Sequence, residues 1–180
     1  AIFLLGYITI LIQSLWKKRI INIPHKPSKF FQLMAIGLTT LVFIQITLGA
    51  FTAGLDAGHL FGTFPKMGPY WIPPSVGELQ PLWRNIIDHP ITILFSHRTL
   101  GIMILVIYVI AFFNYSLKPR KNQKINMILW LILWLIVLQT GLGIATILFH
   151  IPVLLASLHQ LGATCLLLAC ISLVYQSRSA

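Results

Sequence analysis

Long runs of apolar residues separated by shorter polar segments organise this chain. Four runs have the roughly 20 residues that a helix needs to cross a bilayer, and they cover about residues 30–51, 90–117, 126–149 and 152–176. An opening apolar run at residues 1–16 is shorter, and we interpret it as the end of a truncated transmembrane helix. The pattern therefore predicts an all-α polytopic membrane protein: a four-helix transmembrane bundle preceded by the end of another helix.

The polar segments between these runs differ in length and in charge. Residues 17–29 form a basic, proline-containing loop, and residues 118–124 form a second basic loop. Residues 52–89 form a long connection that contains all three acidic residues of the chain. The last two runs are separated only by a turn at residues 150–152, and so short a turn predicts an antiparallel hairpin. We therefore place a bundle of two helical hairpins at residues 30–176.

The composition agrees with a membrane protein. The chain has 180 residues, of which 57% are hydrophobic and only 9% are charged, whereas soluble domains carry about 25% charged residues. The net charge of +10 comes mainly from the two basic loops, which hold nine of the thirteen basic residues. Basic loops of membrane proteins stay on the cytoplasmic or matrix side, so we expect residues 52–89 on the opposite, outer face. The charge is a topology signal, and we expect no nucleic-acid partner.

Two histidines occupy matching positions in two of the expected spans. His97 follows Pro90 by seven residues, and His159 follows Pro152 by seven residues. At a rise of about 1.5 Å per residue, each histidine lies roughly 10 Å inside its helix. Both helices enter the membrane from the same face, so the two imidazoles are able to point at one object between them. Ionisable groups at such a depth are costly, which makes both histidines functional candidates.

Small residues follow both histidines. Gly101 lies four residues after His97, and Gly162 lies three residues after His159, on the same helix faces. Small side chains there leave room for a large flat group, and a haem with two axial histidines fits this description. Two other interpretations stay open: the histidines pack as hydrogen-bonded residues, or the small residues serve contact between helices. Zinc is disfavoured, because zinc sites need three or four protein ligands and only two are in place.

Other polar residues accompany these histidines. Arg98 either binds haem propionates or lipid phosphates, or extends to the membrane interface. Gln45 and Gln139 open two similar blocks, each preceding one histidine-bearing span, which indicates an internal repeat of the hairpin. Their amides bond either across helices, which is the favoured role, or to a cofactor. The remaining histidines lie in loops or at helix ends, where we expect solvated or interfacial side chains: His25, His59, His89 and His150.

Several blocks match a known family in order and spacing. They are QITLGAFTAGLDAG at residues 45–58, TFPKMG at 63–68, WIP at 71–73, FSHRTLG at 95–101, QTGLG at 139–143 and LHQ at 158–160. As a set they resemble the haem A synthase family of cytochrome oxidase assembly, in its mitochondrial and proteobacterial form. The resemblance covers nearly all of this chain but only the C-terminal half of the family.

The resemblance implies a function and a cofactor. Members of the family are eight-helix membrane enzymes of two similar halves, and they oxidise the C8 methyl of haem O to the formyl of haem A. Their second half holds a haem b between two histidines, which correspond to His97 and His159. The substrate haem and a catalytic glutamate belong to the first half, and no residue of this chain matches them. The resemblance thus implies the cofactor-haem-binding half of the enzyme, without catalytic residues of its own.

The same resemblance implies partners and a location. The partners are haem O as substrate through the other half, membrane lipid, haem O synthase and assembly factors of cytochrome oxidase. The location is the bacterial plasma membrane or the mitochondrial inner membrane. Two alternatives stay open from the residues themselves: a bis-histidine b-type cytochrome that acts only in electron transfer, and a non-enzymatic assembly subunit whose histidines only pack.

Overall fold

A computed structural model of the chain describes residue 10 and residues 27–116 and 123–179. The helix end expected at residues 1–16 and most of the two basic loops lie outside the described residues. The described part contains four long helices: α2 (Lys29–Gly54), α3 (Pro90–Ser116), α4 (Gln123–Leu148) and α5 (Val153–Ser179). Two short 3-10 helices, η1 (Ala57–Leu60) and η2 (Leu82–Ile86), lie in the connection between α2 and α3.

All four long helices are long and apolar enough to cross a membrane. Their outward faces carry large apolar side chains, among them Leu33, Phe113 and Trp134, which are 67%, 57% and 68% exposed. A helix that is apolar all round suits a bilayer, where lipid tails cover the outward side chains. Within the described residues the chain forms no strand. The predicted all-α transmembrane bundle is therefore confirmed.

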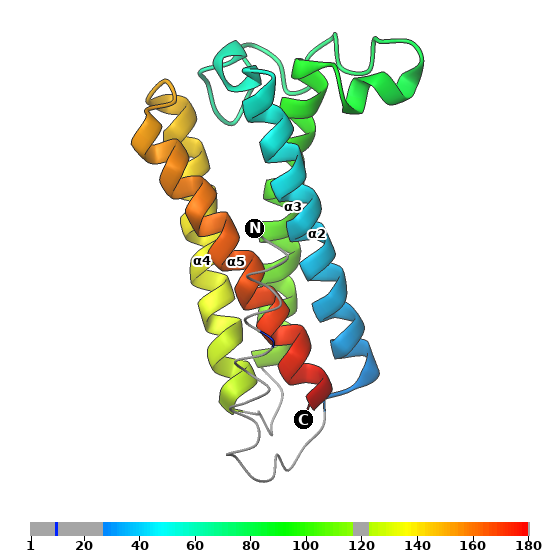
Figure 1. The fold of residues 1–180 in the computed structure, drawn as a ribbon, viewed down its shortest axis with the longest axis vertical. Helices are drawn as coiled ribbons and strands as arrows, with labels where there is room; N and C mark the ends of the chain where they lie inside the picture. Colours follow the sequence, from blue (N-terminus) through cyan, green and yellow to red (C-terminus); the bar gives the residue numbers. More distant parts are fainter. Residues whose placement is uncertain (1–9, 11–26, 117–122, 180) are drawn as a thin grey trace.

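The bundle consists of two antiparallel hairpins that lie side by side (Figure 1). The α2 helix packs against α3, and α4 packs against α5, which is the most extensive helix pair. The α2–α5 and α3–α4 contacts join the two hairpins. Residues 55–89 and the turn between α4 and α5 lie at the same end of the bundle, which we call the loop end. His97 and His159 therefore both belong to helices that start at the loop end.

Most of the apolar core lies away from the loop end. Its members come from the middle and the far half of all four helices and include Val42, Phe112, Ile132 and Cys170. Tyr108 adds a polar link between α3 and α4, because its hydroxyl donates to the carbonyl of Leu129 at 2.6 Å. Toward the loop end, the described residues form a small second cluster of Ala57, Met67 and Leu94. The two hairpins are thus joined most firmly on the far side of the histidines.

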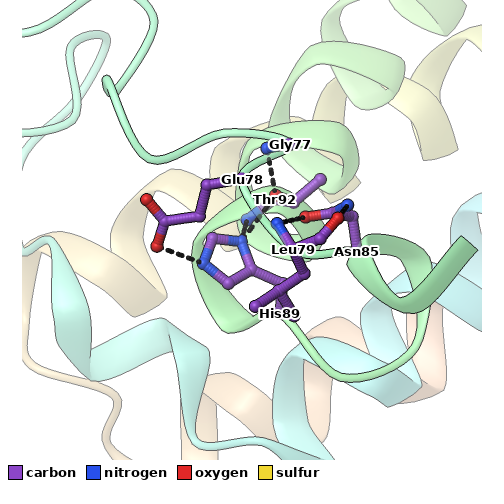
Figure 2. Close-up of polar contacts among 6 residues, drawn as sticks. All are labelled: Gly77, Glu78, Leu79, Asn85, His89 and Thr92. Carbon is purple, nitrogen blue, oxygen red and sulfur yellow. Dashed lines mark hydrogen bonds and ion pairs between the residues drawn. The ribbon is translucent and has the colours of Figure 1, made fainter. Parts of the chain in front are cut away.

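The first turn of α3 anchors the long connection (Figure 2). His89 precedes α3 and is only 8% exposed, so the expectation that it is solvated or interfacial is wrong. Its Nδ1 accepts from the backbone N–H of Thr92 at 3.3 Å and lies 2.6 Å from the Thr92 hydroxyl. The same hydroxyl accepts from the backbone N–H of Gly77 at 3.0 Å.

The Nε2 atom, on the opposite edge of this imidazole, lies close to a carboxylate. Glu78 Oε1 lies 3.4 Å from His89 Nε2. Since Nδ1 accepts a backbone N–H, the ring proton sits on Nε2 and faces this carboxylate. His89 therefore caps α3 through its side chain, a role that serine, threonine, aspartate or asparagine usually fills.

Candidate functional site

The structure brings His97 of α3 and His159 of α5 together. Their ring centroids are 6.5 Å apart, and the ring planes are perpendicular. In a metal site with two imidazoles on opposite sides, each metal–nitrogen bond is about 2 Å long. Each ring centroid lies roughly 1 Å behind its nitrogen, so the two centroids are about 6 Å apart. The observed spacing fits two imidazoles on opposite sides of one metal. It also fits an ordinary edge-to-face aromatic pair, so the surroundings of the rings decide between the two.

A glycine of the neighbouring helix lies directly under each imidazole. A Cβ built on Gly49 of α2 would come within 3.0 Å of His97 Cε1, and one on Gly143 of α4 within 3.1 Å of His159 Cε1. Both distances are tighter than nine in ten real Cβ contacts, so an added side chain would require the imidazole to shift by a few tenths of an ångström. The two hairpins thus use the same device to hold the two rings, and the internal repeat extends to the contacts of the site.

Neither imidazole uses its Nδ1 within the part of the chain that the structure describes. Both Nδ1 atoms are buried and lack a hydrogen-bond partner. The main chain of Gln45 lies within electrostatic reach of His97, and that of Gln139 within reach of His159, but neither contact has hydrogen-bond geometry. In a neutral imidazole one ring nitrogen carries the proton and the other keeps its lone pair for a metal. Packing alone does not explain two half-buried imidazoles whose buried Nδ1 atoms have no partner among the described residues.

The two glutamines lie beside the glycines that follow the histidines. Gln45 Nε2 donates to the His97 carbonyl at 2.9 Å, and it lies 3.0 Å from where a Cβ on Gly101 would be. The Gln139 amide crowds Gly162 in the same way. We expected Gly101 and Gly162 to leave room for a flat group. The structure corrects this expectation, because the space beside each glycine is filled by an amide side chain.

Arg98 binds the polypeptide at the loop end. Its Nη1 donates to the Thr63 carbonyl at 2.9 Å, and its Nη2 donates to the Phe61 carbonyl at 2.7 Å. The Nε of Arg98 is buried and has no hydrogen-bond partner among the described residues. Since Arg98 follows His97 directly, it ties residues 61–63 to the helix that carries the imidazole.

The glycines under the rings escaped the sequence interpretation. Their signal is present, because Gly49 and Gly143 each close a Gln-x-x-x-Gly block. Among residues 27–116 and 123–179, no cluster of three or more histidine, cysteine, aspartate or glutamate side chains could hold a metal ion. Two imidazoles suit a metal whose other ligands come from a macrocycle, as in haem.

Fold and site together define a membrane-embedded helical bundle in which each of the two hairpins contributes one imidazole to a close, perpendicular pair. The chain belongs to the COX15-CtaA family, described as cytochrome oxidase assembly protein, which matches residues 1–171. Membership agrees with the four apolar helices, and the protein is an integral membrane protein.

Individual relatives carry a consistent name. The human protein "Heme A synthase COX15" is 37% identical over 173 residues, which are 92% of this chain and 42% of the human protein. A "Heme A synthase" of Wolbachia pipientis from Culex pipiens is 40% identical over 122 residues, 67% of this chain and 34% of that protein. The Paracoccus denitrificans "Heme A synthase" is 35% identical over 133 residues, 74% of this chain and 34% of that protein.

The chain spans well under half the length of these relatives. No solved structure matches it.

Proposed function

We propose that this chain is the cofactor-haem-binding half of a haem A synthase, in which His97 and His159 are the axial ligands of a haem b. The relatives' name supports the pathway. The observation that carries the proposal is the close pair of imidazoles, each of which contacts a glycine and has an Nδ1 without a partner among the described residues. Haem held by two histidines supplies one-electron transfer.

The residues of this chain would position the cofactor without carrying out the oxidation. Gly49 and Gly143 fix the height of the two rings, and Gln45 bonds the helix at the His97 carbonyl. We propose that the other half of the protein would oxidise haem O at its C8 methyl, and that a haem held by His97 and His159 would supply one-electron transfer for this oxidation. The chain would thus contribute the cofactor ligands and no catalytic group. Arg98, Gln45 and Gln139 would act only as supporting residues.

An optical spectrum of the purified full-length protein tests the ligands. We expect a reduced b-type spectrum that is lost in His97→Ala and in His159→Ala. Cys165→Ala serves as the control, because this exposed cysteine lies further along α5 than His159. An unchanged spectrum in either histidine variant would contradict the assignment of that ligand.

Haem extraction tests the reaction. Cells that make haem O and express the full-length gene should accumulate haem A. Cells expressing the His97→Ala variant should retain haem O. A b-type spectrum without any conversion would favour the electron-transfer cytochrome instead.

We also propose that the loop end faces away from the cytoplasm or matrix, which the basic loops support. A cysteine introduced at Leu82, an exposed residue of the loop end, should react with a membrane-impermeant thiol reagent added from outside. Reaction only after the membrane is opened would reverse the orientation.

A further inference from the structure

A second pair of histidines lines a pocket at the loop end. The pocket has a volume of about 250 Å³, and each hairpin contributes one imidazole to it. The α2–α3 hairpin contributes Gly58, His59 and Gly62, and the α4–α5 hairpin contributes Ile147, His150 and Ile151. Both histidines are exposed, as the sequence predicts for these two. The pocket therefore lies over the same junction of the two hairpins as His97 and His159.

The turn between α4 and α5 adopts an unfavourable backbone to build this pocket. His150 and Ile151 have φ angles of 60° and 58°, a region that β-branched residues almost never occupy. The Ile151 N–H donates to the Thr146 carbonyl at 2.7 Å, which holds the turn. Ile151 Cδ1 would lie 2.7 Å from a Cβ on Gly58, so the terminal methyl of this side chain packs closely against the glycine. Such strain is typical of sites that must present a side chain in one position.

The electrostatic environment of the pocket favours an anion. Its lining, within the part of the chain that the structure describes, includes no carboxylate. The carbonyls of Phe61 and Thr63, on either side of the lining residue Gly62, both accept from the Arg98 guanidinium. A permanent positive charge thus lies behind the wall formed by Gly62. The nearest acid in the sequence, Asp56, is exposed and is not a lining residue.

The level of the pocket relates it to the imidazole pair. Ile147 lies four residues after Gly143, which holds the His159 ring, so this wall stands about 6 Å closer to the loop end. The edge of a flat macrocycle held between His97 and His159 would reach this level. Two imidazoles without a third ligand are too few for a zinc site. Imidazole N–H groups backed by a guanidinium suit a carboxylate.

We propose that His59 and His150 bind the carboxylate arms of the porphyrin held between His97 and His159. This inference rests on the proposed function. It assigns a role to two histidines that the axial ligation does not use. It also assigns Arg98 an indirect role, because its charge acts through the wall at Gly62 without contact with the carboxylate.

Retention of two porphyrins by the full-length protein tests the inference. The apoprotein in detergent is loaded with iron protoporphyrin IX or with its dimethyl ester, which lacks the carboxylate charges. The variants are His59→Gln, His150→Asn and the double variant. Asparagine is chosen at position 150 because it tolerates a positive φ.

We expect each substitution to speed the loss of the dicarboxylate about tenfold, since a charge-assisted hydrogen bond has about this value. The rate at which the protein loses the dimethyl ester should be unchanged. Lys66→Gln is the control, because it removes a full charge from the same connection outside the pocket, where Lys66 Nζ lies 5.4 Å from the Trp71 ring centroid. All three variants should keep the spectrum of two axial histidines.

Other outcomes would overturn the inference. Equal weakening of both porphyrins in the variants would mean that the histidines only support the fold. Variants that alter binding of inorganic phosphate or of anionic-lipid vesicles, but retain both porphyrins equally, would assign the pocket to a free anion or a headgroup. A wild-type protein that binds neither porphyrin would remove the proposed function and this inference together.

Discussion

The two hairpins hold the same imidazole in different surroundings. In both, a glycine of the first helix lies under the histidine of the second. In the α2–α3 hairpin the following glycine comes four residues after His97, and Gln45 bonds the His97 carbonyl. In the α4–α5 hairpin it comes three residues after His159, and neither amide atom of Gln139 has a partner among the described residues. The glycine under the ring is therefore common to both hairpins, whereas the hydrogen bond of the amide is found in the α2–α3 hairpin.

The loop-end connections of the two hairpins also differ. Residues 55–89 are tied to α3 through Arg98 and through the cap at His89. The α4–α5 turn is much shorter and depends on two residues with positive φ and on the contact of Ile151 with Gly58. One hairpin therefore uses side-chain hydrogen bonds where the other uses backbone strain and apolar contact.

Enlarging the glycines under the rings should have the largest effect. Gly49→Val and Gly143→Val should each weaken or abolish the two-histidine haem spectrum, because the Cβ of valine already crowds the imidazole and its two methyl groups add further bulk. Gly37→Val on α2 and Gly141→Val on α4 are matched controls, since a Cβ at either position meets nothing within 4 Å. Absorption spectra of the four purified variants compare the two positions under the rings with the two control positions. Loss of the spectrum in the controls would show that valine harms these helices by itself.

Removing the Arg98 guanidinium should have the next largest effect. Arg98→Met frees two carbonyls, and a hydrogen bond to a charged group contributes about 1.5–3 kcal/mol before its partly exposed position reduces this value. We expect residues 55–89 to become sensitive to added protease while the α4–α5 turn stays resistant. Limited proteolysis with mass spectrometry measures both segments in one sample. Equal resistance of wild type and variant would show that Arg98 does not hold the connection.

Substitutions of the two glutamines should change the stability of the protein in different directions. Gln45→Met should destabilise the protein by about 1 kcal/mol, the usual contribution of one hydrogen bond. Gln139→Met should be neutral or stabilising, because it removes a buried amide that lacks partners; Gln139 is only 7% exposed. Thermal unfolding in detergent compares the two. If both variants lose stability equally, Gln139 has a partner outside the described residues.

The cap of α3 should show the smallest effect. Thr92→Val removes the hydroxyl that links His89 to Gly77 (Figure 2), and should cost about 1 kcal/mol. Thr99→Val is a matched control on an exposed position of the same helix. Hydrogen exchange at Gly77 and Thr92 reports the change locally. Unchanged protection at Gly77 would place its anchor elsewhere.

Much of the fold follows from the sequence because apolar length is a strong signal. The four runs predict the four helices, and the matched distance from proline predicts that His97 and His159 share a level. The side-chain contacts are a different matter. That Gly101 faces an amide, or that His89 is buried, depends on which helix faces which, and one sequence does not contain that information. The pocket at His59 and His150 was missed for the same reason, since its walls come from segments about 90 residues apart.

The division of the two histidines between the hairpins affects the stability of the protein. His97 and His159 belong to different hairpins, so a cofactor bonded to both joins the hairpins across their junction. A ligand that binds only the assembled bundle stabilises it by mass action, by about 2.7 kcal/mol at a free concentration of 100 times the dissociation constant. The apolar core already joins the hairpins on the far side, so this added stability falls mainly toward the loop end. The abundance of the protein in cells should therefore follow the supply of haem, because protein without cofactor opens there and is degraded sooner.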